Sequence, residues 1–230
     1  MAESYEFRPI AHIHTGFPEK FGIPRQSLLV PDAKGKIIFE PEFRHPDILR
    51  GLEGFDYLWI SFVFSENVRT KWNATVTPPK LGGRERKGVF ATRSPFRPNP
   101  LGLSCVKLEG VTYEEKYGNV INVSGVDMLD GTPILDIKPY IAYADAHPEA
   151  RAGFVEDTRG EMEVVIPNEL QALIPEDDRR TVHDLLKQDP RTAFIHDDDR
   201  IWGVTYKNMN IRFKARDGVI TVCGIEPILA

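Results

Sequence analysis

The amino-acid sequence predicts a mainly β protein, with a closed β-barrel in residues 1–145 and a small α+β domain after it. Strand-like segments in the first part are short, and many of the chain's 18 glycines and 18 prolines separate them. Few stretches with helical spacing lie between these segments. This combination favours a closed barrel over a doubly wound sheet, in which helices alternate with strands. At 230 residues the chain can bury a substantial core, in one large or two small domains.

Five barrel strands are predicted from apolar–polar alternation or from dense apolar runs. The strongest is Asp-Tyr-Leu-Trp-Ile-Ser-Phe-Val-Phe at 56–64, whose aromatic and β-branched residues suit a fully buried strand. A charged turn at 114–118 separates the third strand from the fourth, and residues 45–52 add one helical turn beside the barrel. The predicted strands are 7–16, 56–64, 101–113, 119–126 and 134–137.

The composition changes after about residue 144. Residues 144–160 are polar and weakly periodic, so we expect a linker at 146–160 and a second domain at 161–230. A helix is predicted at 175–187, where Val182, Leu185 and Leu186 form an apolar stripe, and Gln-Asp-Pro ends it. Two further strands are expected at 201–206 and 219–225.

The charge distribution bears on the class of partner. A net charge of −5 argues against a protein that coats polyanions in general. Residues 84–107, however, hold six basic residues against one acid, Glu85, which gives a local balance of +5. This excess coincides with a proline-rich loop and favours an anionic or electron-rich partner. The six are Arg84, Arg86, Lys87, Arg93, Arg97 and Lys107.

The cysteine and histidine patterns do not predict a metal site. Cys105 and Cys223 lie far apart in apolar, alternating stretches, so we expect buried free thiols. His12 and His14 alternate on a predicted strand, where hydrogen-bonded strand histidines are commoner than a metal pair. The acidic run at 197–199 is typical of a solvated turn. With no leader-like start and no membrane-length apolar run, we expect a cytoplasmic protein.

The proline-rich loop at 90–104 reads Phe-Ala-Thr-Arg-Ser-Pro-Phe-Arg-Pro-Asn-Pro-Leu-Gly-Leu-Ser. Its prolines fix φ and remove backbone donors, so the segment before residue 101 cannot be a central helix or strand. This stiffened segment carries Arg93, Arg97 and Asn99. Because its backbone is already restricted, little conformational entropy is lost when these side chains bind a ligand. The alternative is a crossover loop whose arginines are simply solvated.

Two further segments carry grouped polar residues. The first, at 127–140, contains Asp-Gly-Thr-Pro, which is good turn chemistry, followed by Asp136, Lys138 and Tyr140 on one face of a strand. An acid, an ammonium group and a phenol side by side suit a cleft, but a structural turn with an ion pair explains them as well. The second, Phe-Gly-Ile-Pro-Arg-Gln-Ser at 21–27, presents Arg25 and Gln26 on a proline-stiffened turn.

These three segments together closely resemble the TsaA-like (TrmO) family of S-adenosylmethionine-dependent tRNA methyltransferases. The matching strings are Ala-Thr-Arg-Ser-Pro-Phe-Arg-Pro-Asn-Pro-Leu-Gly-Leu-Ser at 91–104, Asp-Gly-Thr-Pro-Ile-Leu-Asp-Ile-Lys-Pro-Tyr at 130–140 and Gly-Ile-Pro-Arg-Gln at 22–26. The resemblance spans about residues 5–145 and is looser beyond them. It implies a β-barrel rather than a Rossmann-like methyltransferase, without a metal.

The resemblance implies N6-methylation of threonylcarbamoyladenosine at position 37, beside the anticodon of a threonine tRNA. It also implies a homodimer with the pocket near the subunit interface. The family often has histidine where this chain has Ser65, so a hydrogen bond to the donor must be lost or replaced here. By carry-over, the S-adenosylmethionine site comprises Pro24, Arg25, Gln26, Ser65, Glu66, Arg93, Leu103, Asp130, Gly131, Thr132 and Pro133.

The chemistry assigns roles to the remaining polar residues. Methyl transfer from a sulfonium requires mainly alignment of nitrogen, methyl and sulfur. Acyl substitution acidifies the adenine N–H, so a base can favour the nucleophilic form. We expect Asp136 as that base, with Lys138 and Tyr140 completing the catalytic group. Arg97 and Asn99 are expected to bind the modified base, because an arginine fork suits the threonyl carboxylate better than lysine does.

The second domain is expected to help hold tRNA. Residues 160–230 carry nine Lys or Arg against thirteen Asp or Glu, a net charge of −4. Within them Lys207, Arg212, Lys214 and Arg216 form a stretch without acids, interleaved with aromatic residues. Such a pattern suits a single-stranded loop, whose phosphates attract and whose bases stack. An exposed basic strand edge that resists aggregation is the alternative.

Two other functions remain open from the sequence. One is a non-catalytic barrel that binds RNA or a ligand, although such a barrel does not need the full polar set. The other is a related methyltransferase with a different substrate.

Overall fold

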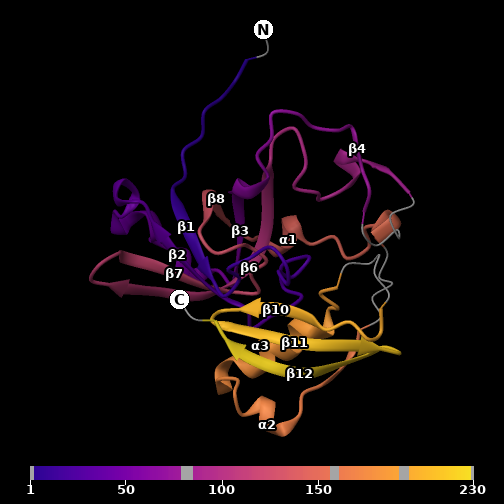
Figure 1. Ribbon diagram of the computed structural model, residues 1–230. Coiled ribbons are helices and arrows are strands. Elements are labelled where there is room, and N and C mark those ends of the chain that lie inside the picture. The colour runs from indigo at the N-terminus through magenta and orange to yellow at the C-terminus, as the bar shows by residue number, and fades with distance from the viewer. Residues whose placement is uncertain (1–2, 79–84, 156–160, 192–196, 229–230) are drawn as a thin grey trace.

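Six antiparallel strands close into a barrel, as the sequence predicts (Figure 1). The computed structural model describes residues 3–78, 85–155, 161–191 and 197–228. Around the barrel the strand order is β1-β2-β7-β6-β3-β8, and β8 pairs with β1 to close it. The barrel strands are β1 (Ala11–Thr15), β2 (Lys34–Phe39), β3 (Tyr57–Val63), β6 (Leu101–Glu114), β7 (Gly118–Ser124) and β8 (Thr132–Pro139).

Alternation along the strands fills the barrel interior. In β3 the side chains of Leu58, Ile60 and Phe62 are buried and the residues between them are only partly buried. All five predicted strands are present. The one barrel strand that the sequence did not predict is β2, whose Lys-Gly-Lys-Ile-Ile-Phe has a glycine and two lysines in its first half.

Short elements connect the strands. The predicted helical turn at 45–52 is a pair of 3-10 helices, η2 and η3, and a small two-stranded sheet pairs β4 with β5. These elements are η1 (Pro41–Phe43), η2 (Pro46–Leu49), η3 (Leu52–Gly54), η4 (Ser65–Asn67), β4 (Thr75–Val76), β5 (Lys87–Gly88) and η6 (Val89–Ala91). Arg84, the first residue of the predicted basic stretch, lies outside the described residues.

The C-terminal part is a four-stranded sheet with helices packed on it, in the order β10-β11-β12-β9. The predicted helix at 175–187 is confirmed as α3, and the predicted strands at 201–206 and 219–225 as β10 and β12. β12 pairs antiparallel with β11 and parallel with the short β9. The elements are β9 (Glu163–Val165), α2 (Asn168–Gln171), α3 (Glu176–Lys187), β10 (Trp202–Tyr206), β11 (Met209–Arg216) and β12 (Val219–Pro227).

β11 corrects one alternative drawn from the sequence. Its basic side chains do not line a sheet edge, because β11 pairs with β10 on one side and β12 on the other. Ile211, Phe213 and Ala215 are buried, and Lys214 and Arg216 alternate with them on the exposed face. The sequence predicts that both cysteines are buried. Cys223 is instead exposed on β12, next to the buried Val222, and Cys105 is partly buried.

The two parts share one continuous hydrophobic core. The ring of Tyr206 packs against Phe17, with centroids 5.6 Å apart, and burial raises its pKa to about 12. A side chain at Gly16 would collide with this ring, since a Cβ there would lie 2.4 Å from Tyr206 Cε2. At Gly22, φ is +90° and a Cβ would lie 2.1 Å from Val204 Cγ2. Both glycines therefore let the segment after β1 press directly on the C-terminal sheet.

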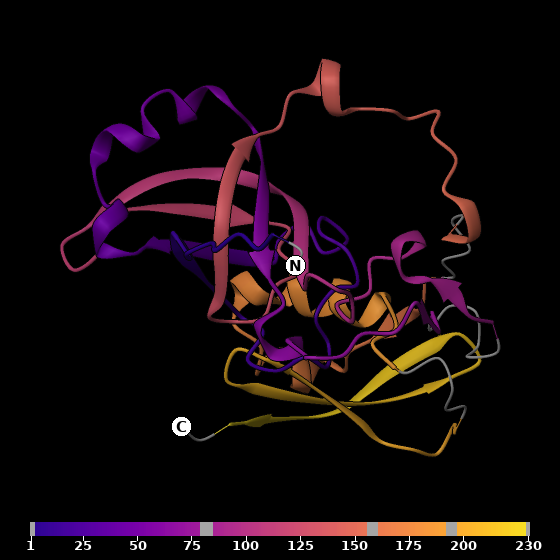
Figure 2. The ribbon, with the colours of Figure 1, turned by 90° about the horizontal axis from the view of Figure 1, so that it is seen from above.

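An extended strap connects the two parts. After β8 the chain forms a single helical turn, α1 (Ala142–Asp145), and then reaches η7 (Gly153–Val155), where Lys87 Nζ of β5 lies 5.3 Å from the Phe154 ring centroid (Figure 2). Most residues between 141 and 155 are exposed. The last residues of the predicted linker, 156–160, lie outside the described residues. No helix in the described ranges has the length and apolar character needed to cross a membrane.

Candidate functional site

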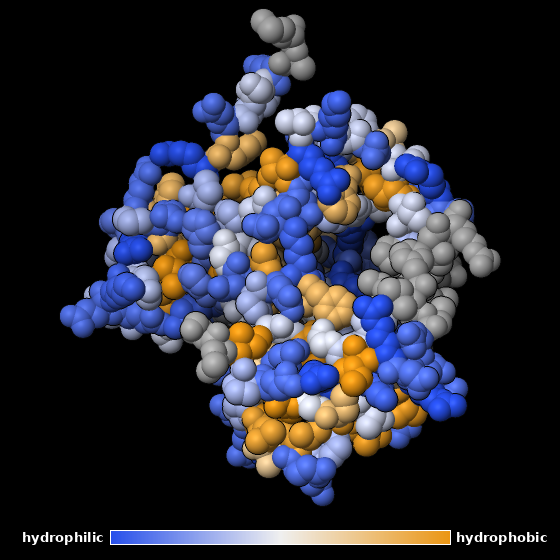
Figure 3. Space-filling model, viewed as in Figure 1, coloured by the Kyte–Doolittle hydropathy of each residue, from blue (hydrophilic) through white to orange (hydrophobic). Residues whose placement is uncertain are grey.

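A pocket of about 900 Å³ opens beside the barrel where loops meet the ends of β3 and β6. Its volume lies in the range of pockets that hold small molecules and cofactors. Space-filling representation shows this face of the molecule hollowed between the barrel and the C-terminal sheet (Figure 3). Five segments contribute: 20–26, 62–67 at the end of β3, 90–99, 101–104 at the start of β6, and 127–132 before β8; Trp59 also lines it.

The proline-stiffened turn at 24–26 forms one wall of the pocket. Pro24, Arg25 and Gln26 all line the pocket, and Arg93 from the opposite loop donates a hydrogen bond to the Gln26 amide oxygen. Gln26 in turn donates to the Arg25 carbonyl at 2.6 Å. Arg25 points its guanidinium to the C-terminal part, donating to the carbonyls of Asp189 at 3.2 Å and Arg191 at 3.3 Å. Arg93 and Gln26 thus form a preformed polar pair.

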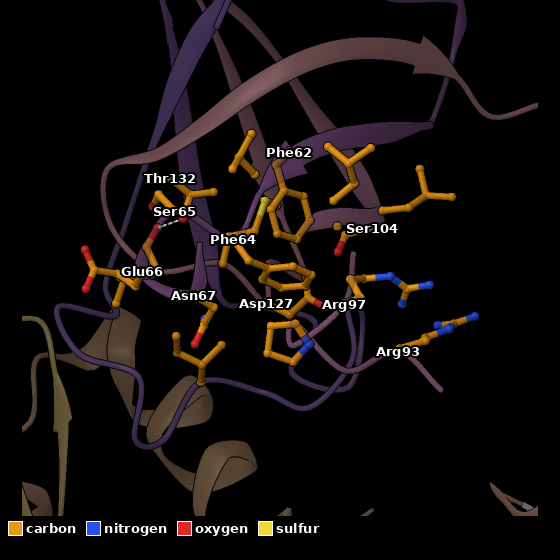
Figure 4. A pocket seen from close by; sticks show the side chains of 18 of the residues that line it. Phe62, Phe64, Ser65, Glu66, Asn67, Arg93, Arg97, Ser104, Asp127 and Thr132 are labelled. Carbon is orange, nitrogen blue, oxygen red and sulfur yellow. Dashed lines mark hydrogen bonds between the residues drawn. The ribbon is translucent and has the colours of Figure 1, made fainter. Parts of the chain in front are cut away.

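The short helix η4 supplies the opposite side. Ser65 and Glu66, for which the resemblance implies donor binding, both line the pocket together with Phe64 and Asn67. The backbone carbonyl of Glu66 accepts a hydrogen bond from Lys20 Nζ at 3.0 Å. Figure 4 shows Ser65 and Glu66 on one side of the pocket and Arg93 and Arg97 on the other, with the Phe62 and Phe64 rings between them. Leu103 and Asn99 also line the pocket.

The proline-rich loop is held partly by its own backbone. Arg97 lines the pocket and donates to the Thr92 carbonyl at 3.1 Å, so one of its N–H groups is used inside the loop. Phe96 lines the pocket, and the Arg69 guanidinium carbon lies over its ring, 4.3 Å from the centroid. Phe90 also lines the pocket and is 76% exposed. This rim therefore combines cations and aromatic faces around one opening.

Only Thr132 of the predicted Asp-Gly-Thr-Pro set lines the pocket. Asp130 holds the turn, because its Oδ1 accepts from the Thr15 backbone N–H at 2.9 Å and lies 3.3 Å from His14 Nδ1. Gly131 has φ of +75° and donates its N–H to the Ile13 carbonyl, and Pro133 pairs with β1. In this structure Asp130, Gly131 and Pro133 therefore fix the turn that places Thr132.

The predicted catalytic group lies outside the pocket lining. Asp136 and Lys138 form an ion pair on the outer face of β8, where both are partly exposed. The Tyr140 ring packs against Tyr57 and Trp59, with centroids 6.1 and 5.9 Å apart. The alternation that places these three residues on one face is real, but that face points away from the barrel interior. This arrangement agrees with the other explanation of these residues drawn from the sequence, a structural turn followed by an ion pair.

The sequence reasoning missed Asp127, which lines the pocket beside Ser104. Burial raises its pKa from 3.8 to about 6, although a hydrogen bond from Ser104, the backbone N–H groups of Ser27 and Asp127, and the charge of Arg93 oppose the rise. Its Oδ1 is buried and has no hydrogen-bond partner among the described residues. One feature of the sequence points to Asp127, because it directly follows the predicted apolar strand at 119–126. The prediction instead assigns the site to the longer Asp-Gly-Thr-Pro run at 130–133.

Other missed lining residues are apolar or aromatic and carry no motif of their own. Core strands and loops supply such residues everywhere, so their type does not mark a site. They include Trp59, Phe62, Val63, Phe64, Phe90, Phe96, Leu101 and Met128.

The predicted tRNA-binding cluster contains acids once the chain is folded. Lys207 bonds to Asp178, a buried carboxylate, at 2.6 Å, and it therefore helps to join β10 and β11 to α3. Arg212 pairs with Glu226 on the neighbouring strand at 2.7 Å. Lys214 and Arg216 remain on the exposed face of β11.

The histidines at the start of β1 have carboxylate partners. His12 Nδ1 lies 2.7 Å from Glu40 Oε1, and His14 contacts Asp130. In the part of the chain that the structure describes, no group of three or more His, Cys, Asp or Glu residues is arranged to hold a metal ion.

The fold and the pocket define a β-barrel protein whose pocket has the volume of small-molecule sites and is lined by aromatic residues and arginines. The chain belongs to the tRNA-methyltransferase O family: the model of the N-terminal domain of that family matches residues 12–146, and the model of its C-terminal domain matches residues 160–228. The family resemblance seen in the sequence is thereby confirmed.

Individual relatives agree with this membership. The chain is 36% identical over 233 residues to the tRNA (adenine(37)-N6)-methyltransferase of Escherichia coli, covering 97% of this chain and 99% of the relative. It is 39% identical over 198 residues to a putative S-adenosylmethionine-dependent methyltransferase, RcsF, of Pseudomonas aeruginosa, covering 83% and 84%. The crystal structure of TrmO from P. aeruginosa superposes with a TM-score of 0.82 at 32% identity, covering 99% of each chain.

Proposed function

We propose that this protein is an S-adenosylmethionine-dependent methyltransferase that N6-methylates threonylcarbamoyladenosine at position 37 of threonine tRNA. The observation that carries the proposal is that segments 24–26, 93–103 and 127–132 meet around one pocket. They do so in a chain whose full-length relative in E. coli is named a tRNA (adenine(37)-N6)-methyltransferase.

The residues of the pocket fit the proposed methyl donor. The partly buried Phe64 ring offers apolar contact for a purine, and the buried Phe62 ring packs against it edge to face, with centroids 5.1 Å apart. Gln26 and Arg93 offer hydrogen-bonding groups that are already held in place. Bound S-adenosylmethionine would supply a methyl group attached to a positively charged sulfonium. Ser65 cannot bridge the distance that a histidine would at the same position, so Asn67 and Lys20 beside it are the groups available to replace that contact.

The residues of the chain bind and orient the substrate and exclude water from it. Arg97 keeps N–H groups beyond the one bound to Thr92, and these suit the threonyl carboxylate of the substrate. Phe90 and Phe96 at the rim suit unstacked bases of an anticodon loop. Lys214 and Arg216 on β11 would contact phosphates further along the tRNA.

The proposed assembly is a cytoplasmic homodimer with the pocket near the subunit interface. Leu101 and Leu103 at the pocket are 47% and 58% exposed, which is apolar area that a second subunit would cover. Sedimentation equilibrium checks the assembly: twice the chain mass of 26.1 kDa is expected, and a single-chain mass at micromolar concentration would contradict it.

Mass spectrometry of nucleosides tests the activity. Threonine tRNA is purified from a strain lacking the gene and from the same strain complemented with it. We expect N6-methylated threonylcarbamoyladenosine only in the complemented strain, and complementation with Arg93→Ala serves as the matched site variant. An unchanged level of the methylated nucleoside in the deletion strain would reject the substrate.

The same preparation separates the alternatives. A methyl-donor complex detected by calorimetry without methyl transfer to any tRNA indicates a binding barrel. Transfer to a different nucleoside, found by survey of all modified nucleosides, indicates a related methyltransferase with another substrate.

A further inference from the structure

Asp127 is a carboxylate inside the pocket to which the functions assigned above give no role. It follows β7, whose last residues are buried, and it lines the pocket next to Ser104 at the start of β6. Figure 4 shows Asp127 and Ser104 near the Phe62 and Phe64 rings, between the arginines on one side and η4 on the other. Its position is therefore in the middle of the site rather than at the rim.

The hydrogen bonding of this carboxylate is incomplete. Its Oδ1 is buried without a partner among the described residues. A buried carboxylate oxygen without a donor costs free energy, and such a group in a ligand site marks a place where a donor is expected to bind. A substrate N–H group directed at Asp127 would supply the missing donor.

We propose that Asp127 is the general base that accepts the N6 proton of the target adenosine. This inference rests on the proposed function. In the step, the N6 lone pair forms the new N–C bond to the methyl carbon while the C–S bond of the sulfonium breaks and its electron pair stays on sulfur. The N6–H bond breaks in turn, its electrons remain on nitrogen, and the proton passes to the Asp127 carboxylate. Atoms and charge balance without a further reactant.

The environment of Asp127 suits this role better than that of Asp136. Asp136 is not among the residues that line the pocket, and its carboxylate is ion-paired to Lys138 on the outer face of β8. Asp127 has a pKa raised to about 6, so it is ionised at neutral pH and still basic enough to take a proton from an acidified N–H. A base with a pKa near the working pH is the most effective.

The groups that face Asp127 come from three segments. Ser104 approaches from β6 and Ser27 presents its backbone N–H from the turn after Gln26; both favour the ionised form. Arg93, from the proline-rich loop, is the charged group that acts on it, also in favour of ionisation. Loss of Ser104 or Arg93 should therefore raise the pKa of Asp127 and move the pH dependence of the methylation rate to higher pH. If Asp127 were purely structural, the pH dependence of the rate would not move.

The test is single-turnover methylation of threonine tRNA that carries threonylcarbamoyladenosine but lacks the methyl group. Wild type, Asp127→Asn, Asp127→Glu, Ser104→Ala and the exposed control Asp177→Asn are compared from pH 5 to pH 9. We expect Asp127→Asn to lower the rate at least about a hundredfold, the size of a general-base contribution. In wild type the rate should rise with pH through about 6, and Ser104→Ala should move this limb to higher pH.

Donor binding gives a readout that does not depend on activity. Calorimetry with S-adenosylmethionine alone should give affinities for Asp127→Asn and wild type within about threefold, because the amide keeps the side chain's shape. Carbon-13 NMR of aspartate-labelled protein should show one carboxyl signal titrating near pH 6 that is absent from Asp127→Asn.

Three results overturn the proposal. Near-wild-type transfer by Asp127→Asn does so directly. Loss of transfer accompanied by loss of donor binding in both Asp127→Asn and Asp127→Glu assigns the residue a structural role instead. Loss of transfer in Asp136→Asn with transfer kept in Asp127→Asn makes Asp136 the base. Wild-type protein that fails to methylate this tRNA at any pH rejects the proposed function itself, a result distinct from the other three.

Discussion

The Asp127 carboxyl group titrates differently in the folded and unfolded chains, and this difference links the site to stability. Its pKa is about 6 when folded, against 3.8 as the ordinary value, and desolvation is the main cause. Between these two values the unfolded chain releases a proton that the folded chain keeps. The free energy of unfolding therefore falls as the pH rises from about 4 to about 6, and the stabilisation by the neutral form is absent above that range.

Asp127→Asn should abolish this part of the pH dependence. The shift of about two pKa units corresponds to about 3 kcal/mol. From pH 4 to pH 7 the free energy of unfolding of wild type should fall by up to about this amount through Asp127. The variant should not show this fall. Urea unfolding at both pH values measures it, with Asp217→Asn as the exposed control. Parallel stability curves for wild type and Asp127→Asn would contradict the prediction.

Arg93→Ala should weaken donor binding more than the same change at an arginine outside the pocket. The side chain holds Gln26 in place and lines the pocket itself, so its removal takes away one binding group and frees a second. We expect affinity to fall at least about tenfold, or about 1.4 kcal/mol. Calorimetry with S-adenosylmethionine measures it, and Arg50→Ala, whose side chain is 79% exposed, is the matched control. Equal affinities for the two variants would remove Arg93 from the donor site.

The sequence predicts which residue types a motif brings to a site better than it predicts their orientation. Gln26, Arg93 and Arg97 all line the pocket, because prolines restrict the backbone of the segments that carry them. Asp136 and Lys138 do not, because alternation on a strand says which residues share a face but not which face meets the cavity. Asp127 escapes prediction since a lone acid after a strand is an ordinary turn signal.

At the scale of elements, the C-terminal sheet supports the wall of the pocket. Trp202 on β10 stacks on Phe21 with centroids 6.5 Å apart, and Val204 lies against Gly22. Arg25 then bonds to carbonyls beyond α3. The segment that carries Gln26 is thus fixed between barrel and sheet, so this sheet contributes to donor binding from outside the pocket.

Trp202→Ala should test that support. Trp202 is 6% exposed, and its truncation should cost about 3–5 kcal/mol of stability. Donor affinity should fall as well, because the segment at 21–26 loses its packing. Both are measured at a temperature where the variant remains folded by circular dichroism. The control is the neighbouring Ile201→Ala, at a side chain that is 45% exposed. Unchanged donor affinity in folded Trp202→Ala would show that the turn holds its shape unaided.

The exposed face of β11 makes a separate prediction for tRNA. A Lys214→Ala, Arg216→Ala double variant should bind tRNA more weakly, and the slope of log affinity against log salt should become less steep by about 0.7–0.9 for each phosphate that is no longer neutralised. Donor affinity should stay unchanged. Filter binding at several salt concentrations measures the slope, and Lys116→Ala in the β6–β7 turn is the control. A slope equal to that of wild type would remove β11 from the tRNA surface.

The elements that the sequence failed to predict have physical reasons in common. β2 and β11 mix lysines, arginines or glycine with their apolar positions, and a short β9 depends on a parallel partner far along the chain. Their pairing comes from tertiary contacts rather than from local pattern. Long alternating or aromatic runs such as β3 and β6 are predictable because their own residues specify both period and burial.

For the whole molecule, the shared core predicts a single unfolding transition. Phe17, Met128 and Ile174 belong to the same buried cluster as Val204 and Tyr206, so the hydrophobic core is continuous across the two parts. Scanning calorimetry should give one peak whose calorimetric and van't Hoff enthalpies agree. Two separated peaks would show that the barrel and the C-terminal sheet unfold independently.

The exposed strap between β8 and η7 has a consequence for how the molecule is held together. The strap supplies the covalent connection, while the buried rings of Tyr206 and Trp202 and the hydrogen bond from the Lys207 backbone N–H to the Gly16 carbonyl hold the two parts together. A single peptide bond cut within 146–152 would leave every one of those contacts in place. The two fragments would stay associated as a nicked protein, and the polypeptide could be given new ends there without dismantling the pocket.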